Sequence, residues 1–78
     1  MQQKILLYYK FIPISDPEAV KLWQKSLCDS LNLRGRILIS RYGINGTVGG
    51  ELQDLKQYIK STKEYGGFKK TVFKWSDG

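Results

Sequence analysis

Histidine is absent from the 78-residue sequence, and cysteine occurs once, at Cys28. Without histidine, the common zinc sites and any Ser-His or Cys-His nucleophilic pair are excluded within this chain. A single cysteine cannot form an internal disulfide, which favours a reducing compartment and predicts a cytoplasmic protein. No paired cysteine or Gly-rich anion loop surrounds Cys28 in the sequence, so a catalytic or redox role is not expected for it.

Long apolar runs are also lacking. No segment approaches the roughly 20 apolar residues that a membrane-spanning helix requires. The short apolar patch at residues 5–7 is not followed by a signal-peptide cleavage region. The sequence therefore predicts a soluble, untargeted chain with no membrane partner.

Acidic residues are few, seven Asp and Glu against 13 Lys and Arg, which leaves a formal charge of +6. Such an excess on a small domain attracts polyanions and raises the rate of association with them. Nucleic acid is the partner class that the charge favours most. Solvated surface charge that serves only solubility is the alternative.

The order of predicted elements is strand, helix, strand, strand, helix, strand. Strands are predicted over residues 4–11, 36–41, 44–49 and 70–75 from their β-branched and aromatic content. One helix is expected to begin at Asp16 or Pro17 and to end near residue 31, and a second to cover residues 51–65. This order predicts an α+β ferredoxin-like split fold over residues 1–78, a four-stranded antiparallel sheet with both helices on one face and the first and third strands central.

Side chains of the first strand alternate between two faces of the sheet. We assign Tyr9 and Phe11, together with Trp23 of the first helix, to the core. The uncovered face is then expected to present six side chains, those of Tyr8, Lys10, Arg36, Ser40, Asn45 and Thr47.

Residues 40–50, SRYGINGTVGG, contain neither a P-loop nor a dinucleotide-binding pattern. A hairpin with a linking pair at residues 42–43 explains them better. Gly43 would supply a positive φ in the turn, and Gly46 would thin a central strand where a helix crosses. Asparagine is depleted in strands, so Asn45 is expected either to cap the turn or to contact a ligand.

Basic and aromatic residues near this segment are candidates for RNA binding. Residues 30–50 contain no acidic side chain, so the arginines there are either phosphate contacts or solvated charge. Tyr8 on a central strand, followed by Lys10, is similar to the base-stacking aromatic of RNA-recognition modules, but the third strand offers no aromatic partner. A partly covered sheet residue is the alternative for Tyr8. The candidate set is Tyr8, Lys10, Arg34, Arg36, Arg41, Tyr42 and Asn45.

The segments KILLYYKF, DPEAVKLWQKSLC, LRGRILIS, GINGTVGG and FKWSDG together resemble the N-terminal domain of the bacterial rhodanese-like tRNA uridine hydroxylases. This resemblance covers almost the whole chain. It implies that the chain is a piece of a longer enzyme, which converts the wobble uridine of certain tRNAs to 5-hydroxyuridine in an oxygen-dependent reaction without an obvious cofactor. The required cysteine would lie in a downstream rhodanese-like domain, so Cys28 is not expected to replace it.

The resemblance also implies an acylphosphatase-like architecture, which agrees with the predicted topology. The acylphosphatase signature, a Gly-x-Val-Gln-Gly-Val-x-Phe-Arg type of loop after the first strand, is missing, and this position reads FIPISDP. Acyl phosphate hydrolysis is therefore not expected. Two roles remain: a domain that holds tRNA, or a non-catalytic module that packs on the rhodanese-like domain.

Overall fold

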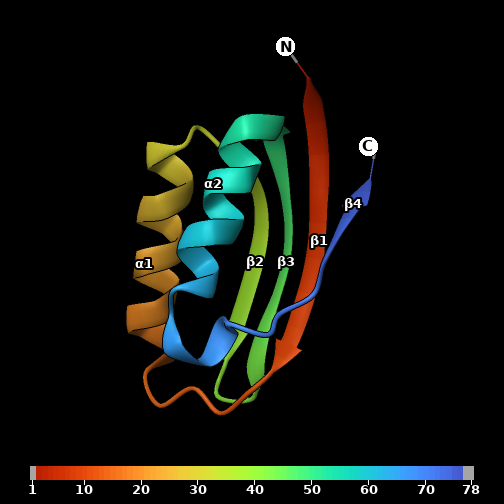
Figure 1. The fold of residues 1–78 in the computed structure, drawn as a ribbon. Helices are drawn as coiled ribbons and strands as arrows, with labels where there is room; N and C mark the ends of the chain where they lie inside the picture. Colours follow the sequence, from red (N-terminus) through yellow and green to blue (C-terminus); the bar gives the residue numbers. More distant parts are fainter. Residues whose placement is uncertain (1, 77–78) are drawn as a thin grey trace.

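A four-stranded sheet covered on one face by two helices makes up the chain (Figure 1). The computed structural model describes residues 2–76, and Met1, Asp77 and Gly78 lie outside this range. Its elements are β1 (Gln3–Phe11), α1 (Pro17–Ser30), β2 (Arg34–Ser40), β3 (Gly43–Glu51), α2 (Leu52–Lys63), the 3-10 helix η1 (Gly66–Phe68) and β4 (Phe73–Ser76). Neither helix within residues 2–76 has the length and apolar content needed to cross a bilayer.

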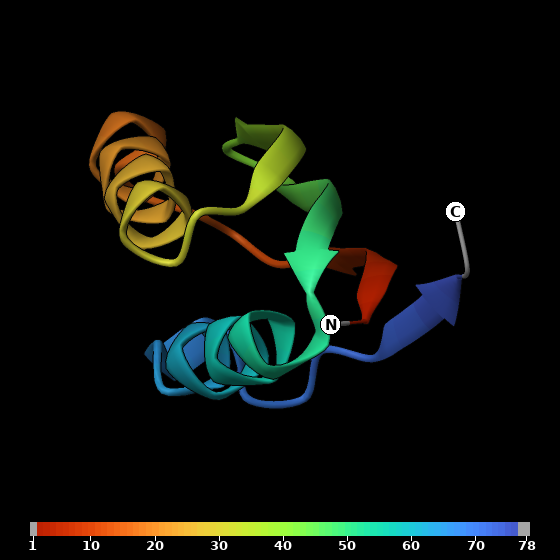
Figure 2. The same cartoon turned by 90° about the horizontal axis from the view of Figure 1, so that it is seen from above.

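All strand pairs are antiparallel, and the strand order is β2-β3-β1-β4. β1 and β3 therefore occupy the centre, and β2 and β4 form the two edges. Viewed from above, α1 and α2 lie on the same side of the sheet (Figure 2). These observations confirm the predicted ferredoxin-like split fold, because two strand-helix-strand halves joined by the β2–β3 hairpin give this arrangement.

Local sequence signals account for where the first helix and the hairpin turn begin. The carboxylate of Asp16 accepts a hydrogen bond from the Ala19 N–H at 3.1 Å, so α1 begins at Pro17 as predicted. In the hairpin, the Ser40 hydroxyl accepts from the Tyr42 N–H at 3.1 Å. The linking pair is therefore Arg41 and Tyr42, one residue earlier than predicted.

The segment after α2 differs more from the prediction. α2 ends at Lys63, and residues 66–68 form the short helix η1 instead of a simple stop. The Thr71 N–H then donates to the Phe68 carbonyl at 3.1 Å, which holds the chain in a turn. As a result β4 begins at Phe73, three residues later than expected.

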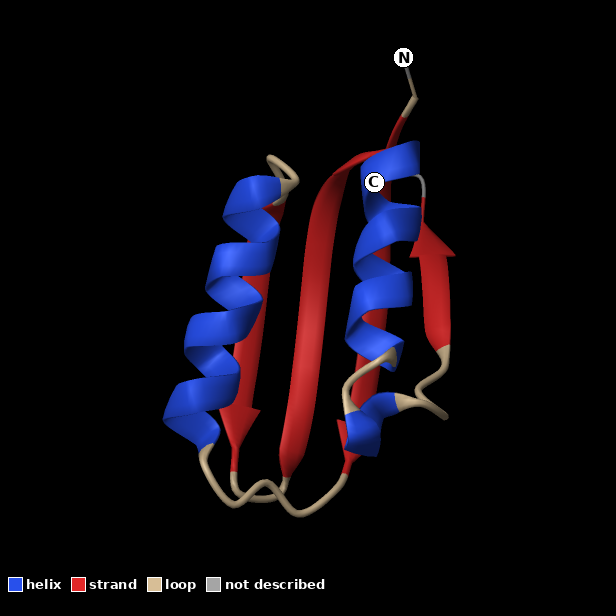
Figure 3. Cartoon of the chain, turned by 60° about the vertical axis from the view of Figure 1, so that its left-hand side comes forward, coloured by secondary structure: helices blue, strands red, loops and turns tan. Residues whose placement is uncertain are grey.

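Both helices lie against one face of the sheet (Figure 3), and the hydrophobic core fills the space between these two layers. Its fully buried side chains include Leu6 of β1, Val48 of β3, Leu55 and Tyr58 of α2, and Phe68 of η1. Trp23 of α1 is half-buried and packs against this cluster, as expected.

The core assignment of Tyr9 and Phe11 is wrong. These side chains are 63% and 81% exposed, on the face of the sheet without helices. The other set of β1 side chains, which includes Leu6 and Tyr8, faces the helices instead. Both sets are apolar enough to form a core, and the alternation alone does not say which of them does.

Candidate nucleic-acid interface

Tyr8 and Lys10, two predicted members of the RNA-binding set, lie on the helix-covered side of the sheet. Tyr8 is 4% exposed and pairs with Gly46 across β1 and β3. Its ring packs against Phe73 with a centroid distance of 4.7 Å. Lys10 is half-buried and pairs with Ile44, a core residue. Neither side chain belongs to the uncovered face, so the prediction that both are presented there is wrong.

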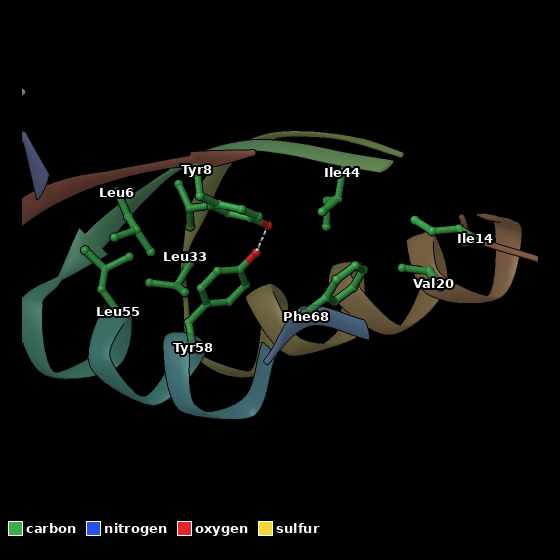
Figure 4. Packing of buried hydrophobic residues seen from close by; sticks show 10 residues of the cluster. Leu6, Tyr8, Ile14, Val20, Leu33, Ile44, Leu55, Tyr58 and Phe68 are labelled. Carbon is green, nitrogen blue, oxygen red and sulfur yellow. Dashed lines mark hydrogen bonds between the residues drawn. The ribbon is translucent and has the colours of Figure 1, made fainter. Parts of the chain in front are cut away.

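Tyr8 instead begins a buried hydrogen-bond network that joins both layers (Figure 4). The Tyr58 hydroxyl donates to Oε1 of Gln24, so the Tyr8 hydroxyl donates to that of Tyr58. The Gln24 amide donates in turn to Oγ1 of Thr62 at 3.3 Å. Because every member is buried, this network satisfies polar atoms that would otherwise be costly to bury and fixes α1 and α2 relative to β1.

We expect the buried phenols to make folding stability fall at alkaline pH. Desolvation is the main cause that raises the pKa of Tyr8 from 10 to about 12, and it raises the pKa of Tyr58 as well. Phenols of the unfolded chain ionise near pH 10, whereas the folded state keeps these protons to higher pH. The contribution of the protonated phenols to folding stability is therefore full below about pH 10 and is lost between about pH 10 and 12. Urea unfolding on the two sides of pH 10 measures this loss.

A Tyr8→Phe variant is the control for this pH dependence. It removes one of the two buried phenols, so its stability should fall less steeply above pH 10 than that of the parent chain. An identical dependence in both chains would contradict the assignment of the effect to Tyr8.

The sheet face without helices, hereafter the open face, is built from alternate residues of all four strands. Cross-strand partners share a face, so the register places them in rows. One row joins Arg36, Thr47, Leu7 and Lys74, and the next joins Leu38, Asn45 and Tyr9. A third row joins Ser40, Gly43 and Phe11. Arg36, Ser40, Asn45 and Thr47 are therefore on the face where they were expected.

Positive charge marks both edges of the open face. Arg36 on β2 and Lys74 on β4 stand at opposite ends of one row, three strand spacings or about 14 Å apart. Arg34 lies on the same face, in the row of Gly49 and Ile5. Glu51 is the one acidic residue among the described strands, and it lies at the far end of β3. The electrostatic field of this face therefore favours an anion.

Exposed aromatic side chains occupy the centre of the open face and the adjoining turn. The rings of Tyr9 and Phe11 meet edge to face with a centroid distance of 5.5 Å. Tyr42 of the hairpin turn is 80% exposed. Together with Leu38, Ser40 and Asn45, these rings line a shallow hollow of about 280 Å³.

The seven predicted site residues thus divide into three groups. Arg34, Arg36 and Asn45 lie on the open face, and Arg41 and Tyr42 form the exposed turn beside it. Tyr8 and Lys10 lie on the helix-covered side of the sheet. The Ser40 hydroxyl accepts the Tyr42 N–H of the turn, and Asn45 is exposed on the open face; its contact with a ligand stays a prediction.

The members of the open face that sequence reasoning missed include Leu7, Tyr9, Phe11, Leu38 and Lys74. The signal that could have found the first three is Gly46, which lies opposite Tyr8 and leaves room for its ring on the core side. Lys74 could not be placed without the pairing of β4 with β1, which joins opposite ends of the chain.

The Cys28 thiol and the possible metal ligands are the features of the described residues that bear on catalysis. Burial raises the pKa of the Cys28 thiol to about 11, so it is protonated at neutral pH and is a poor nucleophile. Within residues 2–76, no three His, Cys, Asp or Glu side chains come close enough together to hold a metal ion. With its exposed rings and edge cations, the open face is a candidate binding surface.

One protein family and one group of named relatives match this chain. Residues 3–78 match the family model described as the UPF0176 acylphosphatase like domain. A protein named tRNA uridine(34) hydroxylase from Corynebacterium glutamicum strain R is 69% identical over 75 residues, which are 96% of this chain and 24% of the relative. Proteins of the same name from Corynebacterium diphtheriae and Arthrobacter sp. strain FB24 are each 61% identical, over 99% and 96% of this chain and 25% of each relative.

This chain spans about a quarter of the length of the curated relatives that it matches. The longer relatives therefore contain at least one further domain. The family match covers nearly all of the chain and confirms the resemblance seen in the sequence. The chain belongs to the UPF0176 acylphosphatase-like domain family.

Proposed function

We propose that this chain is the tRNA-binding domain of a longer, cytoplasmic tRNA uridine hydroxylase. In this proposal the complete enzyme hydroxylates the wobble uridine of tRNA, and a rhodanese-like domain outside this chain supplies the reactive cysteine. The observation that carries the binding role is the open face, where exposed aromatic rings lie between cationic residues on the two edge strands. The names of the relatives supply the class of RNA.

The chemistry of the open face fits an unpaired stretch of RNA. Bases that are not held in a helix stack on aromatic side chains, which is a contact that Tyr9 and Phe11 present on a central strand. Phosphates on either side would meet Arg36 and Lys74. Because a loop offers unstacked bases and a duplex does not, an anticodon loop suits this face better than the stem.

A second candidate role is a structural one. Leu7, Leu38 and Val72 are exposed apolar side chains on or beside the same face. Such a surface also suits packing against another domain of the longer enzyme. The two roles differ in a measurable way, because only the first requires this chain alone to bind RNA.

Replacing both edge cations tests the RNA-binding role. The variant Arg36→Gln with Lys74→Gln should bind a synthetic, unmodified anticodon stem-loop more weakly. The slope of log K against log salt is negative, and its magnitude falls by about 0.7 for each single-strand phosphate that a cation no longer neutralises, so the double variant should have a slope smaller in magnitude by about 1.4. Fluorescence anisotropy over a series of salt concentrations measures this slope.

A matched control carries Lys56→Gln and Lys60→Gln. These exposed lysines belong to α2, on the other side of the sheet, and removing them changes the net charge equally. The control should keep the slope of the parent chain. If both double variants reduce the magnitude of the slope alike, the effect is one of overall charge and the open face is not the binding surface.

A further inference from the structure

A second surface adjoins the open face at Arg34 and runs between α1 and the edge strand β2. We call it the edge groove; its volume is about 420 Å³. From α1 it is lined by Lys21, Lys25 and Cys28, which recur at helical spacing on one side of the helix. From β2 it is lined by Gly35, Ile37 and Ile39, which alternate along the strand. The groove therefore extends along both elements, which are in contact.

The strand that borders the groove has a free edge. Within residues 2–76, β2 pairs with β3 alone, so one row of its backbone N–H and C=O groups has no strand partner. An uncovered edge of seven residues is a template for an added strand. The lining of the groove spans about 10–13 Å along α1 and β2, which is the length of about four extended residues.

Charges around the groove specify the chemistry of its occupant. Lys21 and Lys25 lie on its helix side, and Arg34 lies at one end. Arg36 of β2 points to the open face, so an added strand would meet cations on both of its faces. Asp29 is the one acidic lining residue, and it forms an ion pair with Lys25 at 3.2 Å. An acidic segment complements this surface.

We propose that the edge groove binds an extended acidic peptide, which adds to the sheet as a fifth strand beside β2. Main-chain hydrogen bonds to the free edge would give affinity, and apolar side chains of the peptide would contact Ile37 and Ile39. A second copy of this chain is a poor occupant. Pairing of two β2 edges about a two-fold axis would bring the same arginines of both copies together, and like charges repel.

The test uses a blocked hexapeptide, Glu-Glu-Val-Glu-Glu-Val, which presents glutamate on both faces of an extended strand. It is titrated into the 78-residue chain and followed by amide NMR shifts. We expect saturable shifts in β2 and along the groove side of α1. A lysine-valine peptide of the same length should not bind. Replacing one central residue of the acidic peptide by proline, which removes a backbone donor, should weaken binding severalfold.

Charge reversal at Lys21 and Lys25 makes the test specific. The variant Lys21→Glu with Lys25→Glu should bind the acidic peptide about tenfold more weakly and should gain affinity for the lysine-valine peptide. The matched control, Lys56→Glu with Lys60→Glu on α2, has the same i, i+4 spacing away from the groove and should change affinity less than twofold. The gain for the basic peptide shows that the groove variant is folded.

Three results would overturn the proposal. The acidic peptide causes no saturable shift in β2, or the two peptides bind alike, or an anticodon stem-loop shifts the same α1 amides as strongly as the peptide does. The last result would make the groove a general polyanion site and not a peptide site.

Discussion

Replacement of Gly46 by alanine is expected to lower the free energy of unfolding by about 2–3 kcal/mol, the effect of forcing an extra group into a filled core. A Cβ atom at this position would lie 2.5 Å from Cε1 and 2.8 Å from the hydroxyl oxygen of Tyr8. The ring cannot easily move away, because it is held by Phe73 on one side and by the hydroxyl of Tyr58. A domain of this size has about 4–12 kcal/mol of stability, so the loss would be a large fraction of it.

Gly66→Ala is the matched control. A Cβ atom at Gly66 would meet no atom within 4 Å, so this variant should change the unfolding free energy by less than about 0.5 kcal/mol. Urea unfolding of both variants gives the comparison. The cost at Gly46 should also shrink when Tyr8 is already leucine; an unchanged cost in that background would show that the ring is not its source.

The role of Gly46 explains why the fold was easier to predict than the faces of the sheet. Helical spacing, the Asp16 cap and the hairpin signal determine the order of elements, and these signals are local. The core-facing side of β1 follows from the pairing of Tyr8 with Gly46, which belongs to a different strand. A shift of one residue in the pairing of a strand moves every side chain to the other face of the sheet. The sequence of β1 alone therefore does not determine which of its side chains face the core.

The candidate site was predicted in part for the same reason. Arg36 and Asn45 lie in the hairpin, where short-range pairing puts them on the open face. The sequence pattern predicts Tyr8 as the exposed aromatic residue of the central strand β1, but Tyr8 is buried and its neighbour Tyr9 is exposed on the open face. The buried network of Tyr8, Tyr58 and Gln24 joins three elements far apart in the sequence, and no local pattern predicts it.

Removal of the two exposed rings should cause the largest loss of RNA binding. Stacking of one base on an aromatic side chain contributes about 1–3 kcal/mol. The variant Tyr9→Ala with Phe11→Ala should therefore weaken binding of the anticodon stem-loop by at least about 2 kcal/mol, or about 30-fold. Both side chains are exposed, so the variant should stay folded. Anisotropy titration measures the affinity, and urea unfolding checks the fold.

Two controls separate ring stacking from general loss of apolar surface. Exchange of the two rings, Tyr9→Phe with Phe11→Tyr, keeps both aromatic faces and should keep the affinity. Leu22→Ala removes an apolar side chain that is exposed on α1, in the helix layer, and should not affect binding. A loss in the Leu22 variant as large as in the ring variant would contradict stacking.

The same ring variant distinguishes the two candidate roles of the open face. If the face packs on another domain, RNA affinity of the 78-residue chain is not affected by the loss of Tyr9 and Phe11, and stability of the longer enzyme falls instead. If the face holds RNA, affinity falls in this chain, where the rings are already exposed and no other domain covers them. Because a sheet face cannot stack bases and be buried against a domain at once, a loss of affinity here would assign the face to RNA.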